Sequence, residues 1–260
     1  MKKEDKHSEK KRNKTINIII GIFCITAMIF SGFRIFVWWR ENTKSEEILN
    51  DISDKINVQD VEDENGNSKK KYIINFEGLK EKNSDTIAWI KVENTNIEYP
   101  VVKAKDNDYY LNRSFDKKNN SAGWVFMDYR NKSDGTDKNI VIYGHNRKDK
   151  SMFGTLKNIF TEEWYSNEEN KYITFITEDE YCTYKIFSAY RIEEENYYIT
   201  TSFKNDTEFE KFVNKLKQRS FRDFETEVTK DDQILTLSTC SNANYRVAVH
   251  AKKIINNEEI

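Results

Sequence analysis

The sequence predicts a mainly β fold, a closed or nearly closed barrel of eight strands, with helices before the barrel and one helix inserted ahead of its seventh strand. Eight short runs rich in β-branched and aromatic residues follow residue 86, and irregular loops separate them. Such a series is typical of a barrel that pairs its own edges. Aromatic residues make up 13% of the 260 residues, so a sizeable core is available although 33% of the chain is charged.

The N-terminal residues predict a basic tail over 1–15 and a membrane-spanning anchor over 16–39. Residues 16–33 are apolar apart from three small polar side chains, and a helix of about 20 such residues crosses a bilayer core. Arg34 and the pair Trp38–Trp39 are typical of the outer interface. Lys and Arg ahead of the span favour a cytoplasmic N-terminus. The absence of a small-residue cleavage site favours a retained anchor over a cleaved signal peptide, and both lead to export.

Residues 40–71 are expected to form a helical extension and a linker. Ile48, Ile52 and Ile56 share one helical face, which predicts a helix over 41–58. The polar stretch 60–71 contains the turn signal Glu-Asn-Gly-Asn and is expected to be a loop.

The remaining residues, 72–260, contain the barrel. The strands are expected at 87–92, 97–102, 123–127, 139–143, 171–176, 183–190, 234–239 and 246–254. Short helices are expected at 76–82 and 106–114. A longer amphipathic helix is expected at 206–220, ahead of the strand that ends in Cys240.

The composition narrows the function classes. The net charge is −2, so the chain has no global attraction for nucleic acid, and none is expected as a partner. Three cysteines are a poor basis for a disulfide framework. Cys24 lies in the apolar segment, and Cys182 alternates within a strand as a small apolar side chain. We expect no cofactor and no metal site, since no Cys-x-x-Cys motif exists and few histidines are available.

Cys240 is the candidate nucleophile, because it is a lone thiol at the end of one strand and Arg246 opens the next. A catalytic thiol needs a base, and three histidines exist. His7 lies in the tail, and His250 lies roughly 13 Å from Arg246 along one strand at 3.3 Å per residue. His145 ends a strand and is the better base; alone, it would be interpreted as a structural residue.

Arg246 can be an ordinary ion-pairing residue, or it can stabilise an oxyanion beside the thiol. A guanidinium stays protonated under all relevant conditions, which suits it to the second role. Cys, His and Arg together, with no obvious Asp or Asn partner for the histidine, favour acyl transfer through a thioester.

Two motifs carry a family resemblance. The run Thr236-Leu237-Ser238-Thr239-Cys240 with Arg246, and the run Tyr143-Gly144-His145-Asn146, resemble the sortases, the cysteine transpeptidases of Gram-positive bacteria. The block Phe126-Met127-Asp128-Tyr129-Arg130-Asn131, the retained anchor and the helix before the cysteine strand are similar to class B. The resemblance covers about residues 45–255.

This resemblance implies a sortase-type barrel over 72–260 and a catalytic triad of Cys240, His145 and Arg246. It also implies substrate-binding positions at Asn107, Leu111, Tyr143 and Ser238. For the last three, interpretation as core residues or a strand hydroxyl stays open. The loop from Cys240 to Arg246 is short, and Ser241 stands where class B members often have an acidic residue.

The implied reaction is cleavage of a sorting signal of the Asn-Pro-x-Thr type at the threonine carbonyl, followed by transfer to an amine of a peptidoglycan precursor or a pilin. The implied location is the cell membrane, crossed once, with the barrel outside.

Three other interpretations compete with this one. The first is a membrane-tethered cysteine hydrolase, and the second is a non-catalytic wall-binding barrel. The third, a papain-like protease, is disfavoured because His145 precedes Cys240 here.

Overall fold

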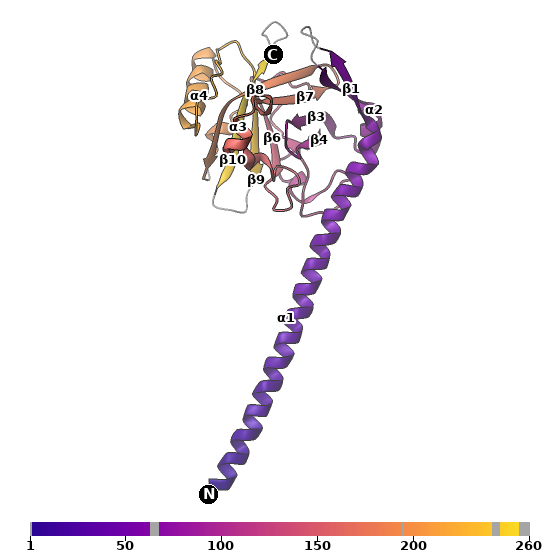
Figure 1. Ribbon diagram of the computed structural model, residues 1–260, viewed down its shortest axis with the longest axis vertical. Helices are drawn as coiled ribbons and strands as arrows, with labels where there is room; N and C mark the ends of the chain where they lie inside the picture. The colour runs from indigo at the N-terminus through magenta and orange to yellow at the C-terminus, as the bar shows by residue number, and fades with distance from the viewer. Residues whose placement is uncertain (1, 63–67, 194, 241–244, 255–260) are drawn as a thin grey trace. The chain divides into compact units, whose positions relative to one another are not determined.

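The computed structural model describes residues 2–62, 68–193, 195–240 and 245–254. The chain divides into two compact units, Met1–Lys44 and Ser45–Ile260. The first unit is part of one long helix, α1, which runs from Lys2 to Ile52 (Figure 1).

Helix α1 is apolar enough to cross a membrane. An 18-residue window within it has a mean hydropathy of 2.2, and none of that window is buried. Large apolar side chains such as Phe23, Met28 and Phe30 are exposed. By length and composition this helix is therefore a candidate membrane anchor.

The end of α1 differs from the expectation. Its last residues belong to the second unit, where Ile48 and Ile52 are buried. The helix ends at Ile52 rather than at residue 58, because the 3₁₀ turn η1, Ser53–Lys55, follows and β1 then begins. Strand β1, Ile56–Glu62, pairs antiparallel with β2, Ser68–Ile74. The expected loop over 60–71 is thus wrong for the residues described on either side of 63–67.

The β1–β2 hairpin has a physical reason that spacing alone conceals. Ile56 fits a helical face at four-residue spacing, but it also fits a strand, where it lies opposite Ile74. Tyr72 packs on Trp89 of the barrel with ring centroids 4.6 Å apart. This tertiary contact favours the strand. The turn signal at 64–67 lies outside the described residues.

Eight strands close into a barrel in the order β10-β8-β7-β3-β4-β5-β6-β9. Their bounds are β3 Thr86–Val92, β4 Glu98–Val102, β5 Phe126–Met127, β6 Asn139–His145, β7 Tyr172–Thr177, β8 Tyr181–Ile192, β9 Ile234–Cys240 and β10 Arg246–Ile254. The predicted mainly β barrel and all eight of its strands are confirmed, with changes at the strand ends.

Helices occupy the connections between strands. Their bounds are α2 Phe76–Lys82, η2 Tyr109–Asn112, η3 Leu156–Phe160, α3 Glu162–Tyr165, η4 Glu168–Lys171, η5 Tyr197–Ile199 and α4 Asp206–Arg219. The helix expected at 106–114 is only the 3₁₀ turn η2, because the Asp106 side chain accepts the backbone N–H groups of Asp108 and Tyr109 and fixes a turn.

Helix α4 confirms the amphipathic helix ahead of the cysteine strand. Its buried side chains, Phe209, Val213 and Leu216, join a cluster with Phe187 of β8. On the same strand, Cys182 is buried, and burial raises the pKa of its thiol to about 12. Cys182 is therefore an inert packing residue, as its alternation predicts.

The pairing of β6 with β9 positions the site. These two strands run parallel, so their carboxyl ends meet at one end of the barrel (Figure 1). In this register His145 is the partner of Cys240. Strand β10 then returns antiparallel to β9, with Ala248 opposite Ser238. Continuing that register by two residues sets Arg246 opposite Cys240 along the backbone.

Candidate active site

The three proposed triad residues converge on one end of the barrel. His145 and Cys240 are paired at the ends of adjacent parallel strands, which lie about 4.8 Å apart in a sheet. Arg246 begins the strand on the other side of β9. Residues far apart in the sequence are thereby brought to neighbouring backbone sites.

A cleft of about 550 Å³ opens at this end of the barrel. It is lined by six of the seven residues that the sequence singles out: Asn107, Leu111, Tyr143, His145, Ser238 and Arg246. The seventh, Cys240, is described by its backbone, and Ser238, two residues before it on β9, lies in the cleft wall. The structure thus gathers the predicted residues around one concave surface.

His145 is held by a backbone carbonyl rather than by a side chain. Its Nε2 lies 2.7 Å from the carbonyl oxygen of Leu111. A carbonyl only accepts hydrogen bonds, so this contact places the proton of a neutral imidazole on Nε2. Nδ1 is then the nitrogen left to exchange a proton with a substrate or a thiol.

Arg246 supplies positive charge to the cleft. It is half-buried, and its guanidinium donates to Oδ1 of Asn196 over 3.4 Å. A guanidinium in this place is suited to an oxygen that gains negative charge during acyl transfer.

His250 is structural. It is completely buried, and burial lowers the pKa of its imidazole to about 3. Its Nδ1 is hydrogen-bonded to Thr236 at 2.9 Å and its Nε2 to Tyr190 at 3.0 Å. A neutral, fully bonded imidazole away from the cleft cannot serve as the base, in agreement with the choice of His145.

The polar groups of Asn107 and Tyr143 are engaged with a buried carboxylate. Asp128 is inaccessible to solvent, and its Oδ2 accepts from Tyr143 Oη at 2.8 Å and from Asn107 Nδ2 at 3.1 Å. Burial alone would raise the pKa of Asp128, but hydrogen bonds from Arg130 and Tyr143 outweigh it and lower that pKa. Asn107 and Tyr143 therefore shape the cleft wall while their hydrogen-bonding groups face inward.

The other two expected substrate-binding residues also have internal partners. Leu111 contributes the carbonyl that holds His145. The hydroxyl of Ser238 is 2.9 Å from the hydroxyl of Tyr198, which is fully buried. In the cleft, all four expected positions thus present side-chain surface and bond to the protein behind it.

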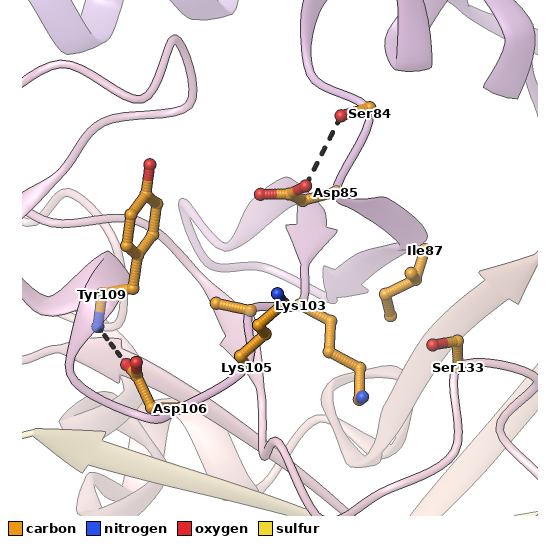
Figure 2. A pocket seen from close by; sticks show the side chains of 9 residues that line it. Ser84, Asp85, Ile87, Lys103, Lys105, Asp106, Tyr109 and Ser133 are labelled. Carbon is orange, nitrogen blue, oxygen red and sulfur yellow. Dashed lines mark hydrogen bonds between the residues drawn. The ribbon is translucent and has the colours of Figure 1, made fainter.

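A second hollow of about 550 Å³ lies on another side of the turn that includes η2 (Figure 2). Its lining includes Asp85, Lys103, Lys105 and Asp106, with no histidine or cysteine among the described residues that form it. Figure 2 shows the Asp106 carboxylate directed at the backbone nitrogen of Tyr109, a bond of 2.8 Å. This hollow therefore supports the turn whose Leu111 carbonyl holds His145.

Comparison with known proteins agrees with this geometry. Residues 90–254 match the sortase domain family. The chain is 34% identical to sortase B of Listeria monocytogenes, covering 86% of this chain and 87% of that protein. It is 31% identical to sortase B of Staphylococcus aureus, covering 94% and 98%. A structure of sortase B from B. anthracis in complex with AAEK1 superposes with a TM-score of 0.71 at 35% identity, covering 84% of this chain and 99% of that one.

The chain belongs to the sortase family, in class B. It is accordingly a cysteine transpeptidase on a closed eight-stranded barrel.

Three parts of this sortase's cleft were missed as site residues in the sequence: Asp128, Arg130 and the segment 196–199. Asp128 and Arg130 lie in a block that carries the family resemblance, and an acid inside the apolar run Phe-Met-Asp was the available signal. The segment 196–199 follows a run of glutamates that predicts only a solvated loop. Its place in the cleft depends on the barrel's closure, which no local pattern encodes.

Gly123 offers a test of how closely His145 is held in this sortase. It has φ +62°, and a Cβ there would lie 2.7 Å from Cδ2 of His145 and 2.8 Å from the Leu111 carbonyl oxygen. We expect Gly123→Ala to displace the imidazole and to lower kcat by roughly tenfold or more, because about 1 Å of misplacement is costly in catalysis. Steady-state cleavage of a peptide, with the melting temperature, measures both effects.

Gly135→Ala is the matched control. Gly135 also has positive φ, +69°, but a Cβ there meets only ordinary contacts, the nearest at 3.5 Å from Ile140. Both variants carry the backbone strain of an L-residue in this region, about 1–3 kcal/mol. Equal turnover in the two variants would show that the contact with His145 does not matter.

Proposed function

We propose that this sortase cleaves a C-terminal sorting signal of the Asn-Pro-x-Thr type at the threonine carbonyl and joins the released protein to an amine of the cell wall or of a pilin. The observation that carries the proposal is the register that pairs His145 with Cys240, at the end of the barrel where His145 and Arg246 line one cleft. The cleft is a groove of the size a short extended peptide needs.

In the first step the Cys240 thiolate attacks the threonine carbonyl. The S–C bond forms, and the guanidinium of Arg246 stabilises the oxyanion of the tetrahedral intermediate. His145 then gives a proton to the departing amine as the C–N bond breaks. The products are a thioester on Cys240 and a free C-terminal fragment with a new amino terminus.

In the second step an acceptor amine attacks the thioester. His145 takes a proton from the amine nitrogen, the new amide bond forms, and the S–C bond breaks to restore the thiolate. Two relatives support a peptide donor and an amine acceptor. One solved sortase B is in complex with triglycine, and the S. aureus enzyme is solved as a substrate complex.

A product assay separates transfer from hydrolysis. We expect a fluorescent Asn-Pro-x-Thr peptide, incubated with the full chain and a glycine-peptide amine, to give the amide-joined product by mass spectrometry. Without the amine, the free acid should form more slowly, because water is the poorer nucleophile toward a thioester. Free acid as the sole product at saturating amine would favour the hydrolase interpretation instead.

The proposed location is the cell membrane, with the N-terminus in the cytoplasm and the barrel outside. The apolar window of α1 and the excess of Lys and Arg over 1–15 support this orientation. Protease treatment of intact cells should remove the barrel and spare an epitope at the N-terminus. Recovery of the full chain after such treatment would contradict the orientation.

A further inference from the structure

The cleft has two walls, and Arg130 connects them. On one side lie Asp128 and Tyr143, which come from β5–β6. On the other side lies the segment 196–199, called here the 196–199 wall, which includes η5 and precedes α4. Arg130, Asn196 and Ile199 all line the cleft.

The guanidinium of Arg130 directs its donors to both walls. Nε donates to Oδ1 of Asp128 at 2.8 Å, and one terminal nitrogen donates to Oδ2 of Asp128 at 2.6 Å. The same terminal nitrogen donates to the carbonyl oxygen of Ile199 at 2.9 Å. Because Asp128 is fully buried and accepts from Tyr143 and Asn107 as well, it is a fixed anchor for the guanidinium.

The 196–199 wall depends on such ties, because its own backbone gives it little rigidity. Ile199 N and Thr200 N make single-turn bonds of 3.3 Å to the carbonyls of Asn196 and Tyr197. Side chains supply the other ties: Tyr198 bonds to Ser238, and Asn196 accepts from Arg246. Short 3₁₀ turns have poor hydrogen-bond geometry, so contacts with the rest of the protein determine where this wall lies.

We propose that Arg130 is a positioning residue that sets the width of the cleft by holding the 196–199 wall to Asp128. The role concerns the fit of the peptide rather than the chemical steps, because Cys240, His145 and Arg246 are carried by β9, β6 and β10. The kinetic part of this inference rests on the proposed function, whereas the structural part does not.

Arg130→Lys tests the proposal. A lysine keeps the positive charge beside Asp128, but it lacks the planar fork that reaches a carboxylate and a carbonyl together. We expect hydrogen exchange at the amides of Ile199 and Thr200 to speed up by about tenfold in the free enzyme, as for loss of one charge-assisted bond. The KM for the sorting peptide should rise by about tenfold, with kcat within about threefold of wild type.

Arg222→Lys is the matched control. Arg222 is also a partly exposed arginine, but its guanidinium lies 4.1 Å from the ring centroid of Tyr165, outside the cleft. It should leave both the exchange of Ile199 and Thr200 and the KM unchanged. Unchanged exchange in Arg130→Lys, or equally fast exchange in the control, would overturn the proposal.

Two further outcomes are decided in advance. If Arg130→Lys fails to fold, the pair Asp128→Asn with Arg130→Gln removes both charges, leaves no unpaired buried carboxylate, and should show the same faster exchange. If no peptide is turned over even by wild type, the exchange alone decides, since it needs no substrate. A raised KM with unchanged exchange would indicate direct substrate contact by Arg130; it overturns this inference and leaves the proposed function standing.

Discussion

Replacing Cys240 with alanine is expected to abolish cleavage and transfer, lowering kcat by at least about 10⁴-fold, as removal of a nucleophile does in other covalent catalysts. The reason is that the proposed reaction passes through a thioester, and an alanine has no atom that can form it. The measurement is the rate of release of a fluorescent fragment from an Asn-Pro-x-Thr peptide, together with a search by intact mass for the acyl-enzyme.

Cys182→Ala is the matched control for this result. Cys182 is the buried thiol of β8 whose pKa is raised to about 12, so its loss should leave turnover intact and cost at most modest stability. A folded Cys240→Ala variant that still cleaved the peptide would rule out a thioester. A folded variant that bound the cell wall normally and had lost only cleavage would rule out the non-catalytic wall-binding interpretation.

Replacing His145 with glutamine should have the next largest effect, a fall in kcat of about 10²- to 10⁴-fold, the usual range for loss of a general acid–base group. Glutamine can still donate a hydrogen bond to the Leu111 carbonyl, which histidine Nε2 contacts at 2.7 Å, so local structure should persist. It cannot move a proton, so the departing amine is no longer protonated. Steady-state cleavage measures the loss, and alkylation of Cys240 by iodoacetamide shows whether the thiol stays accessible.

Two comparison variants sharpen this prediction. His7→Gln changes a histidine of the 1–15 tail and should leave kcat unaltered. Arg246→Lys keeps a positive charge in the cleft and should cost less than His145→Gln does, because an ammonium can still stabilise the oxyanion in part. If His145→Gln kept more than a tenth of wild-type kcat, another group would have to supply the proton.

The strands of the barrel could be predicted because each one carries its own local signal. In β9, for example, the alternation of Leu235, Leu237 and the hydroxyl residues between them indicates a strand without reference to any partner. The β1–β2 hairpin could not, because the same isoleucine spacing fits a helix and the deciding contact, Tyr72 on Trp89, is distant in sequence. Local patterns define elements; contacts between elements choose among them.

The candidate site shows the same limit. Cys240, His145 and Arg246 stand out because their side chains have chemistry and end or begin strands. The partner of His145 could not be found, because it is the backbone carbonyl of Leu111 and every residue has one. Asp128 and Arg130 were recognised as a block without a role, since only the fold reveals that they face Tyr143 and the carbonyl of Ile199.

The parallel pairing of β6 with β9 has a consequence for when this enzyme becomes reactive. Residues 146–233 separate the two strands in sequence, and the imidazole and the thiol meet only after that whole crossover has folded and β9 has inserted between β6 and β10. Contacts of such long sequence separation form late, because loop closure must precede them. A chain still being exported therefore carries its thiol without a proton-transfer partner, and maturation of the barrel itself acts as the step that switches the nucleophile on.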